Sequence, residues 1–343
     1  MKQLLNTLYV TTEPGYLHLD HDTVRVDVNG STRLQVPLHH LGAIVCFGDV
    51  MITPALVRRC AEEGRSLVYL NRHGGFVARV EGPASGNVLL RRAQHVASMD
   101  TDWPARIARN IVAAKIQNTR QVILRASREA ENADDSAPLS EVAKEQAIII
   151  TRLDSANNLD QIRGLEGEGA RAYFQAFGHM VREDRETFRM QGRSRRPPLD
   201  RTNALLSFLY TLLLNDCVAA VEGAGLDPQV GFLHSLRPGR PSLGLDLMEE
   251  LRAVLADRLA LTLINRRQVT RDDFVEKVGG AIQFTDEARK RVVIAYQKRK
   301  QDEVEHGVAN QKVPLGLVPH VQARLMARHL RNDIEEYPPF LWR

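Results

Sequence analysis

The spacing of apolar residues changes its period near residue 83, and this change constrains the fold more than any other feature. Before that point apolar and polar residues alternate, as in the valines from Val24 to Val28, which lead into the hairpin dipeptide Asn29-Gly30. Beyond it the apolar spacing is helical almost to the end of the chain. The sequence therefore predicts a two-domain α+β chain, with a small β-sandwich-like N-terminal domain over residues 1–85 and a larger all-helical domain over residues 86–343.

Three shorter patterns predict individual elements. In the N-terminal part, Thr53 can cap a helix, Pro54 suits its first turn and Gly64 can end it. Residues 126–140 are acidic, small and polar, which predicts an exposed loop between helices. Residues 202–215 carry no charge and are rich in leucine, but they are too few to cross a bilayer. We expect them to form the buried central helix of the second domain.

The composition excludes several classes of protein. With 43% hydrophobic and 26% charged residues the chain is globular, and no secretory segment forms at its start. Its three cysteines, Cys46, Cys60 and Cys217, form no CxxC pair, so neither a disulfide framework nor a zinc knuckle is indicated. We expect a protein of the reducing cytoplasm with no membrane segment.

Basic residues recur in short clusters, although the net charge is only +4. Arginine and lysine clusters suit phosphate oxygens, so the set as a whole favours DNA binding, whereas each cluster alone is also typical of a solvated surface. The clusters are Arg91 with Arg92, Arg193 with Arg195 and Arg196, Arg237 with Arg240, Arg266 and Arg267 with Arg271, and Lys298 with Arg299 and Lys300.

A carboxylate falls on the apolar face of the helix predicted over residues 159–177. Helical spacing places Glu166 among the apolar side chains and Glu168 on the opposite side. An inward carboxylate is costly unless a cation accompanies it, so Glu166 either binds a metal or pairs with an arginine of a neighbouring helix. The three glycines between residues 164 and 169 indicate that another backbone approaches closely.

Three further polar candidates follow the turn at residues 225–228. His234 comes directly after apolar residues, at a strand or helix end, and is either a core side chain or a metal ligand. In a helix predicted from about Ser242, Asp246 and Glu249 lie three residues apart, opposite the leucine stripe. They are either metal ligands or a solvated acidic first turn that the helix dipole favours.

Together, Glu166, His234, Asp246 and Glu249 supply one imidazole and several carboxylate oxygens. Such a set suits Mg²⁺ or Mn²⁺ better than zinc. The chain lacks the GxxxxGK[ST], GxSxG and HExxH motifs and a GxGxxG after a strand, so the sites that depend on those motifs are not indicated. The residues therefore favour a metal site without fixing its reaction.

Four short segments of the helical part stand out: Gly164–Gly167, Pro197–Phe208, Gly231–His234 and Leu245–Glu250. In order and spacing they resemble the CRISPR-associated integrase family Cas-one. The N-terminal stretch Leu4–Val10 and the joint Gly82–Arg92 resemble the form that accompanies type I-C systems, so the resemblance covers almost the whole chain.

The resemblance implies a metal-dependent DNA endonuclease and integrase of CRISPR adaptation, an antiviral defence, with the helical domain as the catalytic one. The 3′-hydroxyl of a prespacer would attack the CRISPR repeat by transesterification. Glu166, His234 and Glu249 match the family's metal ligands, Asp246 is an adjacent acidic residue of the catalytic site, and Mg²⁺ or Mn²⁺ is the implied cofactor. Together with the basic clusters, the expected DNA-binding residues are Arg193, Arg195, Arg196, Arg237, Arg240, Asn203 and Ser207.

The resemblance also implies partners. A homodimer, formed through the N-terminal β-domain, would join a small Cas-two dimer and bind prespacer and repeat DNA, and the docking of a Cas-four end-trimming protein stays open. Two other functions stay open as well: a DNA-binding assembly protein without catalysis, and a general repair nuclease of branched DNA. The apolar tail Tyr337–Trp342 is expected to pack on a partner or on its own domain.

Overall fold

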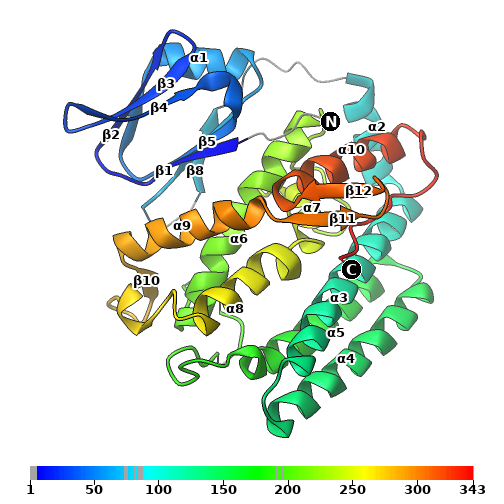
Figure 1. Ribbon diagram of the computed structural model, residues 1–343. Coiled ribbons are helices and arrows are strands. Elements are labelled where there is room, and N and C mark those ends of the chain that lie inside the picture. The colour runs from blue at the N-terminus through cyan, green and yellow to red at the C-terminus, as the bar shows by residue number, and fades with distance from the viewer. Residues whose placement is uncertain are drawn as a thin grey trace. The chain divides into compact units, whose positions relative to one another are not determined.

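The computed structural model describes residues 6–72, 76–80, 82, 88–190, 192–194 and 197–342. The chain divides into two compact units, Met1–Gly86 and Asn87–Arg343. The first is built mainly of strands and the second mainly of helices (Figure 1). The expected two-domain α+β fold is confirmed.

Two four-stranded sheets form the first unit. One has the order β1-β5-β7-β8, with β8 antiparallel to its neighbour, and the other has the order β4-β3-β2-β6, with only β2 and β6 parallel. Buried side chains of both sheets and of helix α1 belong to one core. The elements are β1 (Asn6–Val10), β2 (Gly15–Asp20), β3 (Thr23–Val28), β4 (Ser31–Pro37), η1 (Leu38–His40), β5 (Leu41–Phe47), β6 (Val50–Ile52), α1 (Pro54–Glu62), β7 (Ser66–Leu70) and β8 (Phe76–Val80).

The local signals of this unit explain its turns. Asn29 and Gly30 have φ values of 51° and 74°, the positive values that the tight turn between β3 and β4 requires. Pro54 begins α1, and Gly64 follows its end with φ of 65°. Thr53 precedes the helix as expected, but its side chain forms no capping hydrogen bond.

The second unit is mostly helical, but it is not all-helical as the sequence predicted, because it contains two two-stranded antiparallel sheets, β9-β10 and β11-β12. Strands this short give no alternation long enough to recognise. Its helices are α2 (Val88–Met99), α3 (Asp102–Arg128), α4 (Ala133–Asp154), α5 (Leu159–Ala176), η2 (Phe177–Met180), α6 (Arg201–Gly223), α7 (Ser242–Glu249), η3 (Arg252–Asp257), α8 (Arg258–Asn265), η4 (Arg271–Asp273), α9 (Asp286–Lys300), η5 (Leu315–Leu317) and α10 (Val318–Leu330). Its strands are β9 (Phe274–Glu276), β10 (Ile282–Phe284), β11 (Glu303–His306) and β12 (Gln311–Pro314).

The loop predicted over residues 126–140 is wrong. Helix α3 continues to Arg128, α4 begins at Ala133, and only four residues connect them. The Asn132 side chain caps α4 by accepting a hydrogen bond from the Asp135 backbone at 2.9 Å. Pro138 lies inside this helix, in its second turn, where it did not stop helix formation. Helices α3, α4 and α5 pack side by side (Figure 1).

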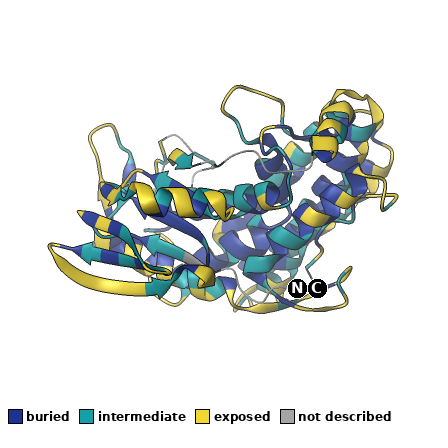
Figure 2. Cartoon of the chain, turned by 90° about the horizontal axis from the view of Figure 1, so that it is seen from above, coloured by how far each residue is buried: buried dark blue, intermediate teal, exposed yellow. Residues whose placement is uncertain are grey.

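The leucine-rich segment forms α6, whose side chains are mostly buried within the unit. By length and composition alone this helix could cross a membrane, but 61% of its apolar window is buried in the protein. Figure 2 shows how the helices carry buried residues on one side and exposed residues on the other. We conclude that α6 is a core helix.

The apolar C-terminal tail packs back onto the helical unit, one of its two expected placements. Tyr337 and Phe340 are 1% exposed. The carboxylate of Glu250 accepts hydrogen bonds from the Tyr337 hydroxyl and the Phe340 backbone, both at 2.7 Å. Asn118 of α3 bonds the Phe340 carbonyl and the Trp342 backbone. The tail is thus part of the core around α3 and α7.

Candidate active site

A buried lysine that the sequence analysis did not single out lies at the centre of the predicted site. Lys115 is on α3 and its side chain is 12% exposed. Its ammonium group forms ion pairs with Glu166 of α5 and with Glu249 of α7, the latter at 2.8 Å from Oε2. The two glutamates, 83 positions apart in the chain, therefore converge on one cation.

Glu166 and Glu168 have different surroundings, as the helical spacing predicted. Glu166 turns toward α3 and is 27% exposed, whereas Glu168 is 39% exposed and pairs with Arg152 of α4 at 2.6 Å. The alternative interpretation of Glu166, an ion pair with a neighbouring helix, describes the contact found here. The partner is Lys115 rather than an arginine.

The glycines around Glu166 were predicted to allow close approach of another backbone, and the structure shows no such approach. At Gly164 and Gly167 an added Cβ would meet nothing within 4 Å. Only at Gly169 is space restricted, and there a side chain, that of Ile116 on α3, lies 3.2 Å away. The predicted close approach of a second backbone is therefore wrong.

His234 lies in the loop between α6 and α7, not at a strand or helix end, and Asp246 fixes its ring. Asp246 Oδ1 lies 2.7 Å from His234 Nδ1 and accepts the His234 backbone N–H at 2.9 Å. Its Oδ2 accepts the backbone N–H groups of Phe232 and Leu233. Because a carboxylate oxygen accepts, His234 Nδ1–H donates to Asp246, and Nε2 points away from Asp246. Nε2 is 3.7 Å from Glu249 Oε1.

The close packing of this loop depends on Gly231. A Cβ there would lie 2.7 Å from Asp246 Oδ2 and 2.7 Å from the Ser242 backbone. Without a side chain at this position, the loop can approach α7 closely enough for three backbone N–H groups to reach one carboxylate. Asp246 is fully buried and orients the loop and the imidazole.

Glu249 is 4% exposed and surrounded by cations. Besides Lys115, it contacts Arg252 at 2.9 Å. Burial alone would raise the pKa of Glu249, but Arg252, Lys115 and His234 outweigh burial and hold it at about 2. The Oε2 atom lies near Lys115 without an aligned hydrogen bond. The alternative of a solvated acidic turn is therefore wrong, since both Asp246 and Glu249 are buried.

A small cavity of about 30 Å³ adjoins these residues, with Lys115 and Arg252 in its lining. Asp257 of η3 lines it too and accepts hydrogen bonds from Tyr173 at 3.0 Å and Tyr210 at 2.6 Å. Burial raises the pKa of Asp257 to about 6, against the opposing effect of both hydroxyls. The Arg252 guanidinium stacks over the Tyr210 ring, 4.7 Å from its centre.

One signal in the sequence could have identified Lys115. It falls on the buried stripe of α3, in register with Ile111, Val112 and Thr119, where a lysine needs an anionic partner. Arg252 carries a similar signal, because it is a cation three residues after Glu249. Both signals are as strong as the one that identified Glu166.

The expected DNA-binding residues are placed differently from one another. Arg237 is exposed and Arg240 partly exposed, whereas Arg195 and Arg196 lie outside the described residues. Arg193 hydrogen-bonds to Asn203 and lies over the rings of Phe174 and Tyr210. Of the other two expected DNA-binding residues, Asn203 is buried and Ser207 is partly buried.

Asn203 is fully buried, and its amide group binds Arg193, the Ser194 backbone and the Gly192 carbonyl. These contacts hold the segment that precedes α6. We therefore expect Asn203 to support this segment rather than to touch DNA directly.

Two carboxylates and one imidazole, from Glu166, Glu249 and His234, are ligands that suit a divalent cation. In the part of the chain that the structure describes, no three His, Cys, Asp or Glu side chains are arranged to hold a metal. Lys115 lies between Glu166 and Glu249, so a metal that used both carboxylates would replace its ammonium group. The carboxylates already hold a positive charge at this point, and His234 Nε2 is close by.

Comparisons with known proteins point to a single family. Residues 8–298 match the family model described as CRISPR associated protein Cas1. A CRISPR-associated endonuclease Cas1 of Moorella thermoacetica is 61% identical over 343 residues, covering all of both chains, and one of Rhodospirillum rubrum is 51% identical over 348 residues, again covering both. A Cas4 exonuclease/Cas1 endonuclease fusion of Geobacter sulfurreducens is 33% identical, covering 98% of this chain and 60% of the fusion.

Two solved structures have the same fold. The Cas1 protein TM1797 of Thermotoga maritima superposes with a TM-score of 0.81 at 22% identity, covering 98% of this chain and 99% of that one. A chain of a Cas6-RT-Cas1–Cas2 complex also gives 0.81, at 25% identity, covering all of this chain and 37% of that one.

Proposed function

The chain belongs to the Cas1 family of CRISPR-associated proteins, and we propose that it is a divalent-metal-dependent DNA endonuclease and integrase of CRISPR adaptation. In the proposed reaction the 3′-hydroxyl of a prespacer attacks a phosphodiester of the CRISPR repeat. One P–O bond forms and one breaks, so no energy cofactor is needed. With water as the nucleophile, the same site cleaves DNA.

The observation that carries this proposal is the convergence of Glu166 and Glu249 on the Lys115 ammonium group, with His234 Nε2 3.7 Å from Glu249. Helix α5 and the stretch from His234 to Glu249 thus bring two carboxylates and one imidazole together around a lysine of α3. Burying several charged groups is costly. Such an arrangement is more typical of a functional site than of a scaffold.

Glu166, Glu249 and His234 Nε2 would hold the metal, Mg²⁺ or Mn²⁺. When bound, the cation stabilises the negative charge that develops on the reacting phosphate. Asp246 accepts a hydrogen bond from His234 Nδ1 and so orients the ring, as carboxylates commonly do for histidines that bind a metal through the other nitrogen. Its contacts are all to the His234 ring and to backbone N–H groups, so we assign it an orienting role.

The remaining cations act on the substrate. Arg252 stays beside Glu249, held over the Tyr210 ring, where a guanidinium can contact a phosphate oxygen. Lys115, once displaced, supplies an ammonium group at the same site. We propose that both residues bind and orient the scissile phosphate.

The partners follow from the family. We propose that the protein acts in the cytoplasm on prespacer and repeat DNA, as a homodimer that joins Cas2. The solved complex that contains Cas1 and Cas2 chains supports this assembly. The fused Cas4–Cas1 relative supports an association with Cas4. We further propose that the first unit mediates dimerisation and that the boundary between the domains lies near residue 85.

Two alternative functions are each compatible with some of these features. A DNA-binding assembly protein would need only the basic surface, with the glutamates neutralised by Lys115 and Arg252. A general repair nuclease would use the same site on branched DNA without preference for a repeat.

Strand transfer by the wild-type protein distinguishes the three. A short duplex is incubated with Cas2 and a supercoiled plasmid, with or without the repeat, in Mg²⁺, Mn²⁺ or EDTA. We expect metal-dependent joining at the repeat edges. DNA binding with no metal-dependent nicking would identify the assembly protein, and equal cleavage of both plasmids and of branched DNA would identify the repair nuclease. A His234→Ala variant should bind DNA without joining it.

A further inference from the structure

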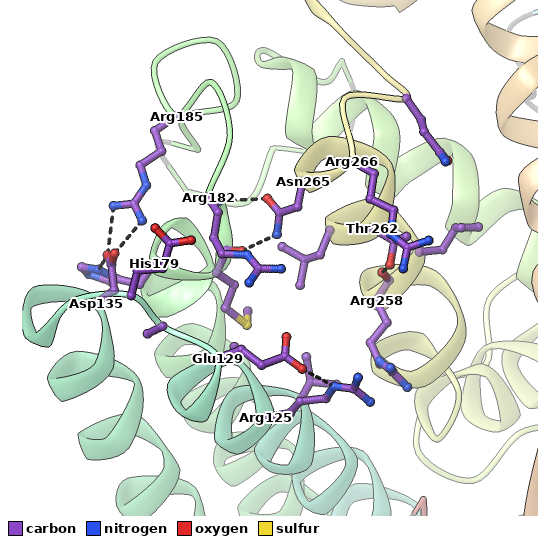
Figure 3. A pocket seen from close by; sticks show the side chains of 18 of the residues that line it. Arg125, Glu129, Asp135, His179, Arg182, Arg185, Arg258, Thr262, Asn265 and Arg266 are labelled. Carbon is purple, nitrogen blue, oxygen red and sulfur yellow. Dashed lines mark hydrogen bonds and ion pairs between the residues drawn. The ribbon is translucent and has the colours of Figure 1, made fainter.

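A large basic pocket lies in the helical unit, and none of the proposed catalytic residues lines it. It has a volume of about 500 Å³ and is enclosed by the end of α3, the start of α4, the segment after η2, helix α8 and the end of α9. Figure 3 shows several of its side chains. Its basic side chains number seven and its acidic ones four, an excess of three positive charges.

Three of the acidic residues are already paired within the lining. Arg125 binds Glu129 at 2.8 Å and Arg299 binds Asp302 at 2.7 Å. Arg185 makes two hydrogen bonds to Asp135, at 2.5 and 3.0 Å, and together with His179 it holds the pKa of Asp135 at about 2. Each of these three carboxylates therefore has an arginine partner of its own.

Four cations of the pocket remain without a carboxylate partner among the described residues: Arg182, Arg258, Arg266 and Lys298. Figure 3 shows the side chains of Arg182, Arg258 and Arg266 among the lining residues, with no interaction drawn from them to a carboxylate. Burial and the neighbouring Arg299 and Arg125 lower the pKa of Arg258 to about 10. Glu129 and Asp302 oppose this shift but do not reverse it, so positive charge predominates around Arg258.

The fold positions the segment that carries Arg182 and the side chain of Arg258. Asn265, at the end of α8, accepts the Arg182 backbone N–H at 2.8 Å and donates to the Met180 carbonyl at 2.9 Å. This clamp fixes the segment carrying Arg182 next to α8, which also carries Arg258. The Arg258 guanidinium lies 4.2 Å from the centre of the Trp342 ring. These contacts bring Arg182 and Arg258 to the same pocket.

We propose that this pocket is a second phosphate-binding site, which takes the sugar-phosphate backbone of a DNA strand. Its lining contains guanidinium and ammonium groups but no Phe, Tyr or Trp. It therefore offers mainly charged groups for phosphate contacts, and His179 is the one aromatic ring among its lining residues. Arginine suits phosphate oxygens because it donates two parallel hydrogen bonds. The inference rests on the proposed function only for the identity of the polyanion as DNA.

The pocket connects to the candidate active site through one helical segment. Arg252, beside Glu249, begins η3, and Arg258 follows its end. Between them, Asp257 is fixed by two tyrosines. A strand that contacts Arg258 in the pocket would therefore lie next to the segment that also carries Arg252 of the candidate active site.

The test uses a double variant of exposed residues, Arg182→Gln with Arg266→Gln, which leaves the core intact. Its control is Arg324→Gln with Arg328→Gln, two exposed arginines of α10, with the same change in net charge. Binding of a labelled short duplex to the full chain is measured by anisotropy over a range of salt concentrations, in EDTA. Thermal unfolding checks that each variant is folded.

We expect the pocket variant to bind at least tenfold more weakly at low salt, with a slope of log Kd against log salt reduced by about two. The control variant should keep the wild-type slope. Equal losses in both variants, or no loss in the pocket variant, would overturn the proposal.

A second arm distinguishes the source of the phosphate. Inorganic tripolyphosphate is titrated into wild type and the pocket variant by calorimetry. If it binds the wild type tightly and loses binding in the variant while DNA affinity stays the same, the occupant is a small polyphosphate and the DNA assignment is overturned. Because binding is measured without metal, a failure of strand transfer in the wild type would contradict the proposed function and leave this inference standing.

Discussion

At the scale of single residues, Lys115 decides the state of the candidate site before metal enters. Its ammonium group neutralises Glu166 and Glu249, which would otherwise repel each other in a buried place. Burial would lower the pKa of Lys115, but the two glutamates raise it above its usual value, so the lysine stays charged. Lys115 therefore acts as a counter-ion within the protein.

Replacing this counter-ion should make the site depend on metal. Lys115→Met leaves two buried carboxylates short of a cation, which costs roughly 3–5 kcal/mol. We expect its unfolding midpoint in EDTA to fall on the order of 10 °C. Added Mn²⁺ should raise it more than it raises the wild-type midpoint.

The matched control is Lys144→Met, which removes an exposed lysine paired with Glu141 at 3.3 Å. Exposed pairs of this kind contribute little, so its midpoint should match that of the wild type. A Lys115→Met protein as stable as the wild type in EDTA would contradict the counter-ion role.

At the scale of elements, the segment η3 is joined to α5 and α6 by one carboxylate. Asp257 accepts hydrogen bonds from Tyr173 of α5 and Tyr210 of α6. Its pKa is raised from 3.8 to about 6, so the folded protein holds this proton more tightly than the unfolded chain. The resulting stabilisation is complete below pH 3.8 and is lost as the pH rises through 6.

Asp257→Asn should remove this dependence. Relative to the wild type, the variant should gain about 2 kcal/mol in free energy of unfolding between pH 4 and pH 7.5. Urea unfolding at several pH values measures the difference, with Glu168→Gln as an exposed control. A difference between Asp257→Asn and wild type that does not change with pH would show that Asp257 titrates normally.

The sequence predicted elements where one local rule dominates. The hairpin at Asn29-Gly30 follows from positive φ, and the buried helix α6 follows from its uninterrupted apolar run. The break between α3 and α4 was misplaced because acidic and small residues typical of loops also suit the first turns of a helix. Asn132 caps helix α4, but the sequence interpretation assigned this residue to a loop because of its polar neighbours.

The candidate site was predictable only in part, for a similar reason. Helical spacing places Glu166 toward the interior but does not name the residue that it meets. Its partner, Lys115, is on a different helix, and only the packing of α3 against α5 and α7 brings them together. The contacts of Asp246 are with an irregular loop, and the conformation of such a loop cannot be predicted from helical or strand periodicity.

At the scale of the whole molecule, the C-terminal tail completes the core behind the candidate site. Glu250 follows Glu249 directly and accepts hydrogen bonds from Tyr337 and Phe340. Gln322 of α10 also donates to its carboxylate, at 2.9 Å. The end of the chain thus holds the residue next to a proposed metal ligand.

Removing residues 337–343 should therefore destabilise the helical unit. The deletion exposes Glu250 and removes two buried aromatic side chains, each worth roughly 3–5 kcal/mol. We expect a large drop in the unfolding midpoint, whereas Leu341→Ala, at a side chain 44% exposed, should change little. An unchanged midpoint after the deletion would mean that the tail does not contribute to the core.

The central claim is that Glu166, and not its neighbour Glu168, belongs to the catalytic site. The two residues lie on one helix, but only Glu166 faces Lys115 and Glu249, while Glu168 pairs with Arg152. The most direct measurement is strand transfer of a short duplex into a supercoiled repeat-bearing plasmid with Cas2 and Mn²⁺, comparing Glu166→Ala and Glu168→Ala. We expect Glu166→Ala to lose joining and nicking but still to bind DNA, and Glu168→Ala to resemble the wild type. An active Glu166→Ala protein beside an inactive Glu168→Ala protein would contradict the central claim.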